Sequence, residues 1–213
     1  MEILPSKVDD SSKDIRLTKF SKELTYTSTH ELIRALVNVR KLIPYRPKLL
    51  VRGRFKPVVR GPMKRRAFLT PAAQNDLENT NSAVWILGGE AAIGSIHNAL
   101  TRWVTGGRVY KSHDTHFLKD LTPPPPEIWE IRVTEPQPQF RIFGRFLEQD
   151  TFIVTNMHSR SFLGKKGSAE WGEAMATCET QWKSLPCMPD PMAENEISKY
   201  VGEEFDDFPI KRY

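Results

Sequence analysis

The chain is poor in cysteine and has no long apolar run. Its two cysteines are too few among 213 residues for a disulfide framework, which favours a reducing cytoplasm. No stretch approaches the ~20 apolar residues of a membrane-spanning helix. The opening residues MEILPSKVDDSSKD also lack the apolar centre of a signal peptide. These absences predict a soluble cytoplasmic protein without a membrane partner.

Signatures of several enzyme classes are also missing. The sequence has no glycine-rich phosphate loop, no nucleophile elbow and no pair of catalytic carboxylates. His113 and His116 flank Asp114 in an H-D-T-H motif, but no further ligand cluster completes a metal site. An ordinary loop explains this motif better than a catalytic histidine does. We therefore expect neither a metal nor a cofactor.

Acidic residues are absent between Arg40 and Arg66, where eleven basic residues gather. Prolines and glycines exclude a long helix there. Tyr45 and Phe55 are interleaved with the charges, as in segments that follow a phosphate backbone and stack on bases. With the net charge of +5, this segment predicts contact with nucleic acid or the ribosome. The expected contacts are Arg46, Lys48, Arg52, Arg54, Lys56, Arg60, Lys64 and Arg65. The alternative is a solvated connector.

Apolar periodicity and capping signals predict the helices. Ser28 and Glu31 have capping-box spacing before a helix that ends at Pro44, which either packs on the core or binds a partner. Residues 67–69 form a short edge strand, and Thr70-Pro71 then begins a second helix. Glycines 88 and 89 join it to a helix over 90–104, which makes a helical hairpin. A last helix spans 168–183 and buries an inert Cys178.

Three successive strands are predicted between Ile128 and His158. The segments IWEIRV, QFRIFGRF and TFIVTNMH alternate apolar and polar residues and are separated by turn residues. The polar face would carry Arg132, Arg141 and Arg145 side by side, next to a basic loop. We expect a phosphate-binding surface there. Side chains on opposite faces, or guanidinium groups held in internal ion pairs, would argue against it.

The expected fold class is α+β, with four regions along the chain. Residues 1–27 form a polar arm, 28–65 an amphipathic helix and basic extension, and 66–185 the core domain. Residues 186–213 form an acidic tail that is disordered or loosely docked, or that folds over the basic surface.

The core region resembles the RelE superfamily of toxins, including its HigB and phage-derived branches. The resemblance rests on FLTPAAQNDLEN, IWEIRV followed by QFRIFGRF, TFIVTNMH, and GKKGSAEWGEAM, and it covers roughly 66–182. It implies a RelE-like fold, in which a helical hairpin packs on a small antiparallel sheet with a C-terminal helix. It also implies the toxin of a toxin–antitoxin pair, with mRNA, the ribosome and a cognate antitoxin as partners.

The family's activity is ribosome-dependent cleavage of mRNA by attack of a ribose 2′-hydroxyl on the adjacent phosphate. By position, the resemblance implies catalytic roles for Arg132, Arg141, Lys165 and Lys166, with Arg145 beside them. Trp171 replaces a tyrosine that some members use, so it can stack on a base but cannot exchange a proton. His158 is then the first choice of general base, and Arg160 of the basic loop would bind RNA. The alternatives are a non-catalytic binder of rRNA or DNA and a gyrase poison of the ParE branch.

Overall fold

A six-stranded sheet forms the centre of the molecule, with the strand order β1-β4-β8-β7-β6-β5. The strands are β1 (Ile43–Pro44), β4 (Arg66–Leu69), β5 (Leu118–Asp120), β6 (Trp129–Val133), β7 (Phe140–Glu148) and β8 (Thr151–Ser159). All neighbours are antiparallel except β4 and β8. The computed structural model describes residues 28–51, 54–57, 62–79, 89–110, 117–121, 127–135 and 137–206. Of 49–51, 54–57 and 89–90 it describes the backbone alone.

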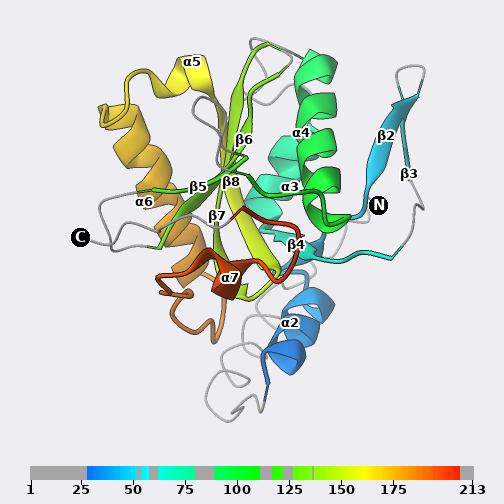
Figure 1. Ribbon diagram of the computed structural model, residues 1–213, viewed down its shortest axis with the longest axis vertical. Coiled ribbons are helices and arrows are strands. Elements are labelled where there is room, and N and C mark those ends of the chain that lie inside the picture. The colour runs from blue at the N-terminus through cyan, green and yellow to red at the C-terminus, as the bar shows by residue number, and fades with distance from the viewer. Residues whose placement is uncertain are drawn as a thin grey trace, which may run out of the picture.

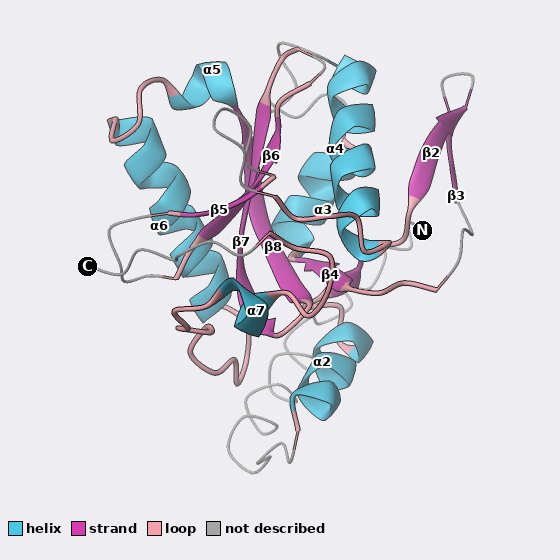
Figure 2. Ribbon diagram, viewed as in Figure 1, coloured by secondary structure: helices cyan, strands magenta, loops and turns pink. Residues whose placement is uncertain are grey.

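Helices cover both faces of the sheet (Figure 1). They are α2 (Thr29–Asn38), α3 (Pro71–Glu78), α4 (Gly89–Val104), α5 (Arg160–Leu163), α6 (Ala169–Lys183) and α7 (Ile197–Tyr200). Helix α6 lies on one face, and α3 and α4 lie on the other. Helices α2 and α7 lie at one end of the molecule and α5 at the opposite end. A separate hairpin of β2 (Lys48–Val51) and β3 (Arg54–Pro57) stands beside α4 (Figure 2). This arrangement confirms the α+β class.

The two predicted helix caps are present. The Ser28 hydroxyl accepts a hydrogen bond from the Glu31 amide at 3.3 Å, and Thr70 caps α3 through the Ala73 amide at 3.3 Å. Helix α2 ends at Asn38, earlier than expected, because Arg40 adopts a φ of 56° and turns the chain into β1. Leu32 and Leu36 of α2 belong to a hydrophobic cluster with Phe68 and Trp182. The interpretation that α2 packs on the core is therefore confirmed.

One expectation about the strands is wrong, and one strand was not expected. β4 is not an edge strand, because β1 pairs with it on one side and β8 with it on the other. β5, which sequence patterning did not predict, pairs with β6 and forms an edge of the sheet. The three consecutive strands β6, β7 and β8 do form antiparallel hairpins as predicted. The glycine turn between α3 and α4 and the arm of residues 1–27 lie outside the described residues.

The acidic tail is an integral part of the core as far as Asp206, contrary to the expectation of loose docking. Ile197, Tyr200 and Val201 are fully buried in the cluster that also holds the residues of α3 and α4. The centre of the Tyr200 ring lies 4.6 Å from the ring centre of Trp129 and 5.1 Å from that of Phe146. Apolar residues between the acidic ones thus bind the tail to the sheet. Residues 28–65 and 186–206 share hydrophobic clusters with 66–185.

Candidate phosphate-binding site

The pairing of three strands gathers most of the residues predicted to be catalytic at one end of the sheet. Arg132 of β6 lies opposite Arg141 of β7, and Arg141 lies opposite His158 of β8. Because residues paired across antiparallel strands point to the same face, these three side chains share the face that α6 covers. Helix α5 follows β8 directly, so its residues lie at the same end (Figure 1).

Glu130 lies between the two arginines of this cluster. Its carboxylate is 3.3 Å from Nε of Arg141 and 3.6 Å from Nε of Arg132. The side chains of Glu130 and Arg141 are only 3% and 2% exposed, whereas that of Arg132 is 18% exposed. For Arg141 the structure thus shows the internal ion pairing that argues against a solvent-facing phosphate ligand. Arg132 alone of the pair reaches the surface.

Burial changes the proton affinity of this ion pair. Desolvation raises the pKa of Glu130 above its usual range, although Arg141 and Arg132 oppose that rise. The pKa of Arg141 falls to about 10 by desolvation, which leaves its guanidinium charged at neutral pH. Arg141 is further bonded to the Phe140 carbonyl at 2.9 Å. Glu130 therefore fixes both guanidinium groups.

Arg145 does not belong to the cluster, contrary to the prediction. It is four residues from Arg141 along β7, roughly 13 Å at the rise of a strand. It is 3% exposed, and its guanidinium lies 5.7 Å from the centre of the Trp182 ring of α6. The predicted polar face is therefore not a solvated surface at this point, because the last helix packs over it.

His158 is held in a defined orientation beside Arg141. Its Nε2 lies 3.1 Å from Nδ2 of Asn156, and its ring stacks on Phe162 with centres 5.2 Å apart and planes 16° apart. The edge of Phe143 contacts the ring from another side. Desolvation lowers the pKa of His158 below its usual value, so the imidazole is neutral at pH 7. A neutral imidazole can accept a proton.

The loop between β8 and α6 supplies further cations. Lys165 and Lys166 are exposed, whereas Arg160 is partly buried and donates a hydrogen bond to the Gly164 carbonyl. The Arg160 guanidinium lies 5.8 Å from the Trp171 ring centre. Trp171 itself is 5% exposed and packs on Phe143. The prediction that Trp171 stacks on a base is therefore wrong in this conformation.

Positive charge prevails around Glu130. Glu130 interacts electrostatically with Arg141, Arg132, Lys119 and Arg160. Lys119 in turn interacts with Lys166 and Asp120. Five cations and two carboxylates leave a formal surplus of three positive charges. Sequence patterning missed Lys119, because β5 has only three residues, and it left Glu130 without a role.

The described side chains of the basic segment, residues 40–66, do not all lie on the surface. Tyr45 is 4% exposed, and its hydroxyl lies 3.0 Å from Thr101 Oγ1 and donates to the His97 carbonyl at 2.9 Å. It therefore packs in the core and does not stack on a base. Arg46 is exposed, and Lys48 pairs with Glu78 at 3.3 Å. Arg54 and Lys56 lie on β3, of which the structure describes only the backbone. Arg52 and Arg60 lie outside the described residues.

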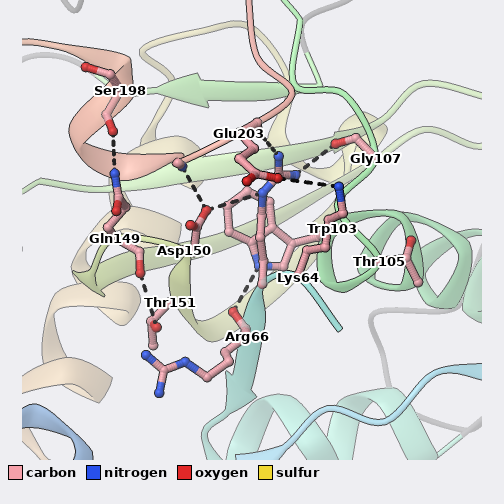
Figure 3. Close-up of polar contacts among 12 residues, drawn as sticks. Lys64, Arg66, Trp103, Thr105, Gly107, Gln149, Asp150, Thr151, Ser198 and Glu203 are labelled. Atoms are coloured by element: carbon pink, nitrogen blue, oxygen red, sulfur yellow. Dashed lines mark hydrogen bonds and ion pairs between the residues drawn. The ribbon is translucent and has the colours of Figure 1, made fainter. Parts of the chain in front are cut away.

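Arg65 joins four segments at the other end of the sheet, so its predicted contact with nucleic acid is wrong. It is 2% exposed and donates hydrogen bonds to the carbonyls of Gly107, at 2.8 Å, and Glu203. Its Nε lies 3.4 Å from Asp150, which also accepts from the Gly202 amide. Figure 3 labels the partner residues Gly107, Asp150 and Glu203, together with Lys64, which donates a hydrogen bond to Glu203. The acidic tail thus binds these two basic residues of the segment.

Among the residues that the structure describes, no group of His, Cys, Asp and Glu side chains could hold a metal ion, and no helix is long and apolar enough to span a membrane. His113 and His116 lie outside those ranges. Cys178 is buried as predicted, and burial raises the pKa of its thiol to about 11.

Comparisons with known proteins give no family for this chain. No family model, no curated protein and no solved structure matches it. The resemblance to RelE toxins therefore stays a prediction that rests on the sequence phrases quoted above. In the structure, these segments contribute to a cationic cluster around the buried carboxylate of Glu130.

Proposed function

We propose that this protein binds RNA through the cationic cluster and cleaves it as a metal-independent endoribonuclease. On this proposal it is a RelE-like toxin of a toxin–antitoxin pair that inhibits translation by cutting mRNA on the ribosome. The observation that carries the proposal is the cluster of Arg132, Arg141, Lys119 and Arg160 around Glu130, with Lys166 near Lys119. Its surplus of positive charge favours a ligand that carries phosphates.

The exposed members of the cluster would make the first contacts with the RNA backbone. Arg132 is the exposed arginine of the ion pair, and Lys165 and Lys166 extend into solvent beside it. Arg145 contributes nothing to this proposal, because it lies under α6. Arg141 would act from below by holding Glu130, and through it the orientation of Arg132.

The proposed reaction needs a proton acceptor, a proton donor and stabilisation of a crowded phosphorane. Neutral His158 gives up the contact of its Nε2 with Asn156 and accepts there the proton of the ribose 2′-hydroxyl as the 2′-oxygen bonds to phosphorus. The bond from phosphorus to the 5′-oxygen breaks, and Lys165 or Lys166 gives that oxygen a proton. The products are a 2′,3′-cyclic phosphate and a 5′-hydroxyl.

Mapping of mRNA 5′ ends in a translating extract tests the proposal. The wild-type protein should produce new 5′-hydroxyl ends. The double substitution Lys165→Ala/Lys166→Ala and the substitution Arg132→Ala should each reduce cutting about a hundredfold, the lower end of the range for loss of one stabilising group. Lys183→Ala, at the far end of α6, is the matched control and should cut normally. Intact transcripts with the wild-type protein would remove the nuclease.

The enclosed position of Glu130 favours a second candidate, a non-catalytic inhibitor that occupies rRNA or DNA. In that case translation stops while transcripts stay intact, and His158→Asn inhibits as well as the wild type. DNA damage without mRNA cleavage would instead indicate a gyrase poison. Either toxin would need a cognate antitoxin that screens the cationic cluster.

A further inference from the structure

Phe162 is an exposed aromatic side chain next to the cationic cluster. It is 54% exposed, and among the large hydrophobic side chains of the described residues only Val39 and Met63, which are not aromatic, are also exposed. It lies on α5, which leads directly from His158 at the end of β8. Leaving a phenylalanine in water forgoes the favourable burial of its apolar surface. Its position beside the cluster therefore calls for a functional explanation.

Contacts with Ser159 and His158 hold the Phe162 ring in place. The Ser159 hydroxyl accepts a hydrogen bond from the Phe162 amide at 3.2 Å, which fixes the turn. One face of the ring stacks on His158, whose imidazole is itself fixed by Asn156 and Phe143. The opposite face contributes to the exposed area. The structure thus presents a supported aromatic platform and not a loose side chain.

The loop that carries the platform is basic, although Asp76 of α3 acts electrostatically on His158 beneath it. From Ser159 to Ala169 the sequence contains Arg160, Lys165 and Lys166 and no acidic residue. A ligand that fits this surface has a flat apolar face and negative charge on either side of it. An unpaired nucleotide in an RNA strand has both, because its base stacks and its flanking phosphates are anionic.

We propose that the outer face of Phe162 stacks on one unpaired base of the RNA, next to the phosphate bound at Arg132. This inference rests on the proposed function and makes its substrate class single-stranded RNA. The stack would place that nucleotide against the cluster, with His158 directly below the platform. A paired base is already stacked in its helix and would not be available to the ring.

Binding of a short single-stranded RNA labelled with fluorescein, followed by fluorescence anisotropy, tests this inference. Phe162→Ala should weaken binding roughly tenfold, within the range measured for loss of one base stack. Phe162→Trp should bind as well as the wild type or better. Met63→Ala removes a side chain of similar exposure elsewhere on the surface and should not change the affinity.

A second set of oligonucleotides with a single abasic site identifies the stacked base. For the wild type, one position of the abasic site should weaken binding about as much as Phe162→Ala does, and that variant should not discriminate among positions. If the RNA binds through Lys165 and Lys166 but Phe162→Ala binds equally well, the stacking inference is wrong, while the proposed function stands. If the wild type binds no RNA at all, the proposed function fails as well.

Discussion

The buried carboxylate of Glu130 determines how two neighbouring arginines are placed. Two guanidinium groups on adjacent strands would repel each other in a site this enclosed, and the carboxylate between them removes that repulsion. The same contact fixes where Arg132 reaches the surface. In the sequence, Glu130 is a single acidic residue on a basic strand face. In the structure, it is the centre of the cluster.

Removal of the Glu130 carboxylate should destabilise the fold. Glu130→Ala leaves the buried Arg141 without its partner, so we expect the free energy of unfolding to fall by about 3–5 kcal/mol. Urea denaturation measures this change. Glu78→Ala, which breaks the more exposed ion pair with Lys48, should cost less than about 1 kcal/mol. Equal stabilities of the two variants would contradict the central role of Glu130.

His97 should make stability depend on pH. Burial lowers its pKa from 6.5 to about 4 in the folded protein. Between these values the unfolded chain binds a proton that the folded chain excludes, so the free energy of unfolding falls as the pH drops from 6.5 to 4. The loss is roughly 3 kcal/mol at 1.36 kcal/mol per pKa unit. In His97→Gln, which keeps a hydrogen-bonding group near Tyr45, this pH dependence should be flatter by that amount.

At the scale of elements, the β7–β8 hairpin depends on a residue without a side chain. The register of the two strands shifts between Phe143 and Gly144, and a Cβ at Gly144 would meet the Ile153 carbonyl and lie 2.6 Å from the Phe152 ring. The close approach of the two strands at this shift therefore requires glycine.

Two glycine substitutions should have opposite effects on stability. Gly144→Ala should lower the free energy of unfolding by about 1–3 kcal/mol, as overpacking of a core does. Gly172→Ala lies on α6, where an added Cβ meets nothing within 4 Å, and should raise stability by up to about 1 kcal/mol. Thermal or urea unfolding of both variants checks the prediction. A tolerated Gly144→Ala would mean that the strands can separate there at little cost.

Local signals in the sequence predicted most helices and strands, but they did not predict which strands pair with one another. The caps at Ser28 and Thr70 and the alternation in β6 and β7 depend on residues close in sequence, so they could be found. The parallel pairing of β4 with β8 joins residues more than 80 positions apart and has no local signal. β5 has only three residues, too few to show a period-two alternation, and it depends on pairing with β6.

The same distinction applies to the candidate site. Alternation along the predicted strands was enough to place Arg132 and Arg141 on one face, and their pairing confirms it. The burial of Arg145 under α6 and of Arg65 under the tail depends on packing between distant segments, which charge patterning does not report. Both side chains look like surface cations in the sequence because their enclosing partners come much later in the chain or on another layer.

For the whole molecule, the proposed RNA binding should depend strongly on salt. Each phosphate contact to a single strand lowers the slope of log affinity against log salt concentration by roughly 0.7. Lys165→Ala/Lys166→Ala should therefore make that slope shallower by about 1.4, as measured by anisotropy at several potassium concentrations. Lys183→Ala should leave it unchanged. An unaltered slope in the double variant would place the phosphate contacts elsewhere on the molecule.

The burial of Ile197, Tyr200 and Val201 against β6 and β7 has a consequence for biosynthesis. A nascent chain that has emerged only as far as α6 presents Trp129 and Phe146 without the aromatic ring that covers them. The molecule therefore completes its core only after residue 201 has left the exit tunnel. A chain that stalls earlier on the ribosome should expose this surface to chaperones and proteases.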